Sequence, residues 1–158
     1  MIAARAHGDL SLLEAGQGHA RELAALHALI FTQSWDAASF GQLLGHPGSV
    51  AFLARVASPP QAVGFILGRL AADEAELLTL GVHQAHRRQG VARRLVALLT
   101  DAAKEAGAKR LFLEVGRNNA AAVTLYQGLG FCQVGLRRGY YEHAGQRRDD
   151  ALVLALAL

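Results

Sequence analysis

Residues 77–107 read LLTLGVHQAHRRQGVARRLVALLTDAAKEAG, and this stretch predicts a strand, a loop and a long helix. Its first part, up to Val82, is an apolar run of strand length. From Val91 to Ala106 the apolar residues recur at helical spacing, and Gly107 provides a favourable end for that helix. The residues between, Arg87-Arg88-Gln89-Gly90-Val91-Ala92, therefore lie where a strand passes into a long helix.

This loop has the features of an anion site. A glycine lets a ligand approach the backbone closely, and the first N–H groups of a helix point towards a bound anion. Arg88 and Arg93 add positive charge that suits a pyrophosphate. The alternative is an ordinary strand–turn–helix connection with solvated arginines. The two glycine-rich phosphate loops with well-known spacings, the Walker loop and Gly-x-Gly-x-x-Gly, do not occur in the chain.

Apolar periodicity on either side of the loop predicts a mixed α/β sheet, mostly antiparallel, of about seven strands flanked by about four helices. Pro59-Pro60 is interpreted as a hairpin turn between two strands. The expected strands cover residues 10–15, 49–56, 62–70, 76–82, 110–115, 131–140 and 148–156. The expected helices cover residues 18–31, 36–44, 91–106 and 120–127.

Length and composition favour a single domain over residues 1–158. A chain of 158 residues that is 52% apolar can bury a core without metal or disulfide, and Cys132 is its one cysteine. We interpret Cys132 as a buried small hydrophobe. The sequence contains neither a signal-peptide pattern nor an apolar stretch long enough to span a membrane, which favours a cytoplasmic protein.

The net charge of +3 conceals an acidic first half and a basic second half. The basic half is dominated by paired arginines, which suit phosphate groups better than lysines do. Aromatic residues amount to 6% of the chain, and stacking residues do not alternate with the arginines. This argues against a nucleic-acid reader.

The loop matches the Arg/Gln-x-x-Gly-x-Gly/Ala signature of the GNAT family of N-acetyltransferases, and two further blocks follow in the family's order. The chain from Leu77 to Leu158 resembles that family. Asn118-Asn119-Ala120-Ala121-Ala122 resembles the start of the family's fourth helix, and Tyr126 to Phe131 resembles the Tyr-x-x-x-Gly-Phe block after it. The resemblance implies the GNAT fold and acetyl-coenzyme A (acetyl-CoA) as cosubstrate. The loop and its arginines would hold the cofactor: Arg87, Arg88, Gln89, Gly90, Val91, Ala92 and Arg93.

Within the family the chain most resembles the RimI-type ribosomal-protein-alanine N-acetyltransferases. Residues 111–115 (LFLEV), 137–141 (RRGYY) and 148–151 (RDDA) carry this likeness. Glu142 stands where RimI-type chains usually have proline, and the segment from there to Asp150 is about one residue longer. That segment borders the amine site in the family, so these two differences affect which amine the chain would accept.

Glu114 is the candidate general base. Strand alternation puts Phe112 and Glu114 on one face and Leu111 and Leu113 on the other. A glutamate at a strand end usually just reaches solvent, but RimI-type enzymes use the matching glutamate as base, and one bridging water suffices for such a role.

Tyr126 is the candidate general acid for the leaving thiolate and a cofactor contact. It lies two helical turns after Asn119, which would reach the coenzyme A arm. The alternative for Tyr126 is a core aromatic at helical spacing.

The resemblance also assigns backbone and substrate contacts. Leu80, Gly81 and Val82 would pair through their backbone with the pantetheine amides, as an added strand does. Tyr140 and Tyr141 would frame the acceptor amine, or simply pack at a strand edge. His83 and His86 lack nearby ligands, so we expect no metal site.

The leading hypothesis is a direct, acetyl-CoA-dependent acetylation of the N-terminal alanine α-amine of a ribosomal protein. A second hypothesis is a GNAT enzyme acting on a small-molecule amine or a lysine side chain. A third, from another class, is a non-catalytic acyl-CoA-binding module. Retention of both Glu114 and Tyr126 argues against the third.

Overall fold

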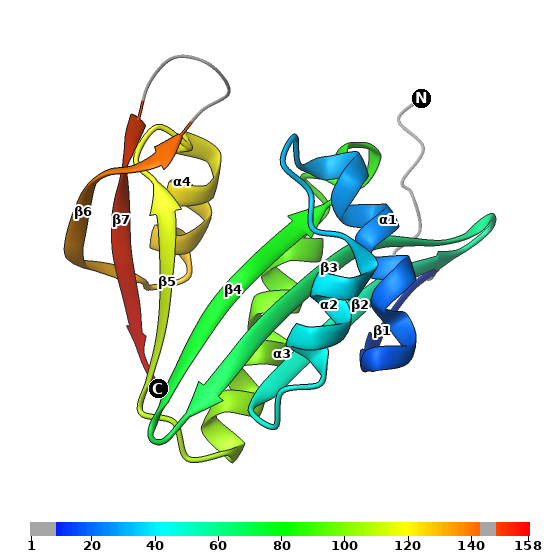
Figure 1. Ribbon diagram of the computed structural model, residues 1–158, viewed down its shortest axis with the longest axis horizontal. Coiled ribbons are helices and arrows are strands. Elements are labelled where there is room, and N and C mark those ends of the chain that lie inside the picture. Colours follow the sequence, from blue (N-terminus) through cyan, green and yellow to red (C-terminus); the bar gives the residue numbers. More distant parts are fainter. Residues whose placement is uncertain (1–8, 143–147) are drawn as a thin grey trace. The chain divides into compact units, whose positions relative to one another are not determined.

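The computed structural model describes residues 9–142 and 148–158, and these residues form one seven-stranded sheet with four α-helices (Figure 1). The strand order is β1-β2-β3-β4-β5-β7-β6. The strands are β1 (Leu10–Glu14), β2 (Ser49–Ala57), β3 (Pro60–Ala71), β4 (Glu74–Val82), β5 (Arg110–Gly116), β6 (Cys132–Glu142) and β7 (Arg148–Ala157). The helices are α1 (Ala20–Ile30), α2 (Ala37–Leu44), α3 (Val91–Glu105) and α4 (Ala120–Gly128).

The sheet is mixed and mostly antiparallel, which confirms the predicted fold class. β1 pairs antiparallel with β2, and β7 pairs antiparallel with both β5 and β6. β4 and β5 are parallel, with a register that runs from Glu74↔Arg110 to Glu76↔Phe112. A parallel neighbour requires a crossover connection, and α3 supplies it.

The described residues form two compact units: residues 9–67 with Thr79–Leu99, and Gly68–Leu78 with residues 100–142 and 148–158. In the first unit, neighbouring residues of β3 face different helices. A Cβ on Gly64 would lie 3.0 Å from Val91 and 3.2 Å from Leu95, so glycine permits the close approach of α3. Phe65, the next residue, contacts the rings of α1 and α2 instead. Helices therefore cover both faces of the sheet here.

An aromatic cluster fixes the connection between α1 and α2. His27 is 3% exposed and stacks on Phe31 and Trp35, with ring centroids 4.3 and 5.2 Å away. Its Nδ1 accepts a hydrogen bond from the Trp35 backbone N–H at 3.1 Å. Burial lowers the pKa of His27, because the charged imidazolium would lose its hydration. A neutral imidazole with its proton on Nε2 satisfies this arrangement.

In the second unit, β5 alternates between the core and a less buried face. Leu111, Leu113 and Val115 are buried, whereas Phe112 and Glu114 are half-buried. α4 follows β5 and places Tyr126 against Phe131, with ring centroids 5.5 Å apart in an edge-to-face arrangement. Face alternation on β5 is therefore as predicted.

Some details of the sequence prediction were wrong. Cys132 is exposed, not buried, because it begins β6 at the edge of the sheet. The helix expected over 18–31 starts as a 3-10 turn, Gln17–His19, and Phe31 has left the helix in extended conformation. β4 begins at Glu74 instead of 76, because its first residues pair with β5. Within residues 9–142 and 148–158, none of the helices is long and apolar enough to cross a membrane.

Candidate active site

The loop before α3 has the backbone geometry of an anion site. Gly90 has φ of +78°, in the left-handed region that favours glycine, and its carbonyl accepts the N–H of Arg94 at 3.1 Å. A Cβ built on Gly90 would have no atom within 4 Å. Arg88 also has a positive φ, +61°, and both residues are exposed. The first N–H groups of α3 have no acceptors within the helix. The backbone just before them, at Gly90, is therefore open to a ligand.

The loop and the end of β4 belong to the same unit and contact each other. The guanidinium Nε of Arg87 donates a hydrogen bond to the Val82 carbonyl at 3.0 Å. Arg87 thus ties the loop to the strand, a role that the sequence did not reveal. Gly81 is a packing requirement, because a Cβ there would lie 2.8 Å from the Phe65 ring.

Glu114 lies on β5, in the second unit, with its carboxylate on the half-buried face. Its side chain is 26% exposed, and its Oε1 accepts a hydrogen bond from Nη1 of Arg137 at 2.8 Å. The neighbours Leu113 and Val115 are buried on the opposite face. A carboxylate held in this way on the open side of a sheet can accept a proton from a bound molecule.

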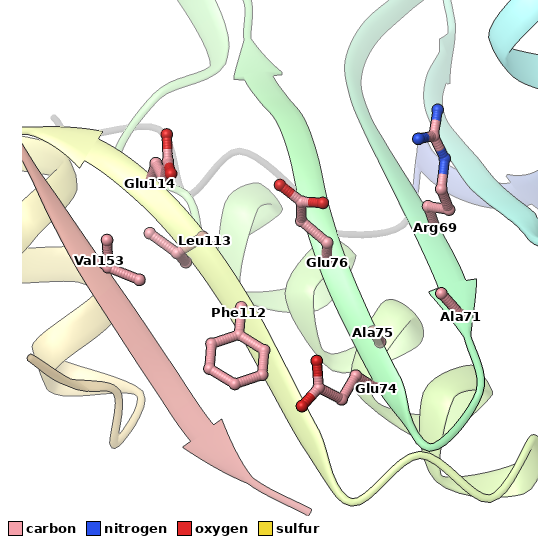
Figure 2. A pocket seen from close by; sticks show the side chains of 9 residues that line it. All are labelled: Arg69, Ala71, Glu74, Ala75, Glu76, Phe112, Leu113, Glu114 and Val153. Carbon is pink, nitrogen blue, oxygen red and sulfur yellow. The ribbon is translucent and has the colours of Figure 1, made fainter. Parts of the chain in front are cut away.

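A cavity of about 280 Å³ opens beside Glu114 within the second unit (Figure 2). Glu114 and Phe112 border it from β5, and Val153 borders it from β7. Glu74 borders the cavity from β4, and its carboxylate pairs at 3.2 Å with Arg110 of β5, whose guanidinium lies 4.8 Å from the Phe112 ring. The lining residues are Arg69, Ala71, Glu74, Ala75, Glu76, Phe112, Leu113, Glu114 and Val153.

Asn119 and Tyr126 occupy the two ends of α4. The side-chain oxygen of Asn119 accepts the N–H of Ala122 at 3.3 Å, so Asn119 is the N-cap. This use of the oxygen leaves its amide N–H₂ group as the donor for any ligand. Tyr126, in the last turn, is 6% exposed. Its ring is thus a core side chain as well as a candidate acid.

Two carboxylates at the start of β7 support these residues, and sequence reasoning missed both. Asp149 is 4% exposed, and its Oδ2 accepts the N–H of Asn118 at 2.9 Å, just before α4. Asp150 accepts the N–H of Gly139 at 2.8 Å and pairs with Arg117 at 3.5 Å. Two consecutive aspartates opening an apolar strand are the sequence signal that could have indicated such a role.

Tyr140 and Tyr141 lie in β6, but their side chains are outside the described part of the structure. Their predicted contact with an acceptor stays a prediction. In the described ranges no three His, Cys, Asp or Glu residues gather in a way that could hold a metal ion.

Comparison with known proteins identifies a family and individual proteins that are similar to this chain in sequence. Residues 16–131 match the model of the acetyltransferase (GNAT) family. The Escherichia coli [ribosomal protein bS18]-alanine N-acetyltransferase is 38% identical over 94 residues, which are 60% of this chain and 63% of that protein. The Mycobacterium tuberculosis N-alpha-acetyltransferase RimI is 38% identical over 142 residues, covering 83% of this chain and 87% of that protein.

Solved structures agree with these sequence relatives. The crystal structure of the ribosomal-protein-S18-alanine N-acetyltransferase from Escherichia coli superposes with a TM-score of 0.85 at 26% identity, covering 94% of this chain and 93% of that one. Arabidopsis thaliana NAA60, solved in complex with acetyl-CoA, has a TM-score of 0.82 at 20% identity and 94% coverage of this chain and 98% of that one. The second likeness concerns the fold alone.

Proposed function

Because this chain belongs to the acetyltransferase (GNAT) family, we propose that it transfers an acetyl group from acetyl-CoA to the N-terminal alanine α-amine of a ribosomal protein. The relatives named for this activity support the acceptor. Such an acceptor would place the enzyme in the cytoplasm. The chain aligns with 63% of the Escherichia coli relative's length, so the activity is carried over as a proposal.

One observation of this structure carries the proposal. Glu114 holds a carboxylate at the edge of a cavity on β5, whereas Leu113 and Val115 on either side of it are buried. The sheet thus turns the Glu114 carboxylate away from the core, at the edge of a space that Glu74 and Glu76 of β4 also line. This is the placement that a general base for an amine requires.

The chain has residues that would hold acetyl-CoA. The exposed backbone at Gly90, together with the start of α3, fits a pyrophosphate, and Arg88 and Arg93 are exposed beside it. Gln89, Val91 and Ala92 belong to the same stretch. Further along the cofactor, the amide of Asn119 and the backbone of residues 80–82 would bind the pantetheine arm.

Replacing Gly90 by leucine is expected to raise the dissociation constant of coenzyme A at least about tenfold. The leucine side chain would project into the open space where the phosphate would lie, since nothing in the protein occupies it. Isothermal titration calorimetry gives the dissociation constant.

Gly107→Leu is the matched control for this variant. Gly107 follows α3, has φ of +86°, and also has no atom within 4 Å of a built Cβ. Both variants carry a similar backbone strain and should lose similar stability. If Gly90→Leu and Gly107→Leu bind coenzyme A equally well, the phosphate assignment is wrong.

Acetyl transfer to an amine needs a base and an acid on the protein. When bound, acetyl-CoA supplies an activated acetyl group. In acetyl transfer the amine nitrogen bonds to the acetyl carbonyl carbon and the carbon–sulfur bond of the thioester breaks. Glu114 would accept the amine proton, directly or through one water, and the Tyr126 hydroxyl would give a proton to the departing sulfur. Tyr140 and Tyr141 frame the amine. We propose a direct transfer, without a covalent acetyl-enzyme, in which the protein contributes position and electrostatics.

The chemistry of the acceptor favours an α-amine over a lysine. An α-amine has a pKa of about 8 and a lysine of about 10.4, so about a tenth of an α-amine is already neutral at pH 7. A carboxylate acting through water handles the first far more easily than the second. A small amine or a lysine remains the second candidate acceptor.

A comparison of acceptors tests the proposal. Coenzyme A release is measured with an alanine-led peptide, with the same peptide blocked at its α-amine but containing lysine, and with a polyamine. The alanine-led peptide should have the highest kcat/KM. Higher values for the blocked peptide or the polyamine would reassign the acceptor, and no release with any amine would favour a binding module.

A further inference from the structure

Arg137 holds the carboxylate of Glu114 from two strands away. Its Nη1 donates to Oε1 of Glu114 at 2.8 Å, and the two side chains are 51% and 26% exposed. Glu114 is on β5 and Arg137 on β6, with β7 between them. The contact is therefore made by a long side chain that crosses a whole strand.

The strand register makes this crossing possible. Val153 of β7 pairs with Glu114, and Ala151 pairs with Arg137. Paired residues project to the same face of a sheet, and residues two apart on a strand share a face. Arg137 and Glu114 therefore lie on the same face of the sheet, and Ala151, the partner of Arg137 on β7, is a small buried residue on that face.

The backbone of β6 is irregular directly after Arg137. Its register with β7 shifts between Arg137 and Tyr141. Within this irregular stretch Gly139 has φ of +62°, and its N–H donates to Oδ1 of Asp150 at 2.8 Å. Bulges of this kind change the direction of a side chain and are common next to active sites.

The fold itself gains little from the Arg137–Glu114 pair. Ion pairs as exposed as this one contribute about 0–1 kcal/mol to stability. The hydrogen bond from Arg137 restricts the rotamers of Glu114, and a general base acts best when its carboxylate is held in one geometry.

We propose that Arg137 is a positioning residue that fixes the Glu114 carboxylate for proton transfer from the acceptor amine. The inference rests on the proposed function, since it gives Glu114 the role of base. Arg137 acts through Glu114 and does not touch the reacting atoms. Its loss therefore lowers turnover and leaves acceptor binding largely unchanged.

Three variants test this role in steady-state kinetics with an alanine-led peptide and saturating acetyl-CoA. Arg137→Gln should lower kcat about tenfold with KM within about twofold of the wild-type value. Arg137→Lys keeps a positive charge and should restore most of the loss. Arg138→Gln is the matched control, because it removes the same charge from the next, exposed residue, and it should keep kcat within about twofold.

A crystal structure of Arg137→Gln gives a readout that does not depend on activity. Glu114 is expected in more than one rotamer there and in a single rotamer in the wild-type protein. The proposal is overturned if Glu114 keeps its single rotamer, if Arg137→Gln and Arg138→Gln have the same kcat, or if lysine restores nothing. A wild-type protein that acetylates no amine refutes the proposed function instead, and the rotamer comparison then still decides the positioning role.

Discussion

Tyr126→Phe is expected to lower turnover by about 10²–10⁴ with little change in the affinity for coenzyme A. Phenylalanine keeps the ring that packs edge-to-face on Phe131 and removes only the hydroxyl. Tyr126 is 6% exposed, so its ring packing contributes to the fold, whereas the proposed acid role depends on the hydroxyl. Steady-state kinetics and calorimetry with coenzyme A separate turnover from binding.

A packing role for Tyr126 makes a different prediction. The variant would then turn over within about a factor of three of the wild-type protein. Equal unfolding midpoints for the two proteins would show that the substitution leaves the fold intact. Turnover that falls together with coenzyme A affinity would indicate a binding contact and contradict the acid role.

Glu114→Gln should lower turnover at pH 7 by at least about tenfold, because only about a tenth of an α-amine with a pKa of about 8 is neutral at that pH. Glutamine has nearly the same shape, and its carbonyl oxygen can still accept the hydrogen bond from Arg137. The substitution thus removes the proton acceptor while changing the strand little.

The pH dependence identifies the lost function. Without a base, the reaction needs an amine that has already lost its proton, so the rate should climb about tenfold per pH unit below the α-amine pKa of about 8 and level off above it. The measurement is the rate of acetylation of an alanine-led peptide at pH values from 6 to 9.5. A variant that keeps the wild-type rate at pH 7, or a flat profile, would exclude Glu114 as the base.

The elements that carry local signals were predictable from the sequence. Residues 77–107 predicted a strand, a loop and a helix, and the structure has β4, the loop and α3 there. The mixed sheet and the membership of the GNAT family were also predicted and are confirmed. The helix predicted over residues 120–127 is α4, which Asn119 caps. The strand, the loop, the helix and the cap are each determined by residues that lie close together in the sequence.

The contacts between distant residues were not predictable. The ion pair of Arg137 with Glu114 depends on β7 inserting between β5 and β6, which brings together residues 23 apart in the chain. Cys132 was assigned to the core by residue type, but its place on an edge strand exposes it. The link from Asp149 to Asn118 likewise exists only once β7 has paired with β5. The roles of the site residues stay predictions.

The position of the acetyl group on a peptide with two kinds of amine tests the proposed α-amine acetylation. The protein is incubated with acetyl-CoA and a single peptide that begins with alanine and carries an internal lysine, and fragment-ion mass spectrometry locates the new acetyl group. Acetylation is expected at the alanine α-amine, at a rate that depends on enzyme concentration. An acetyl group on the lysine Nζ, or an unmodified peptide beside intact acetyl-CoA, would contradict it.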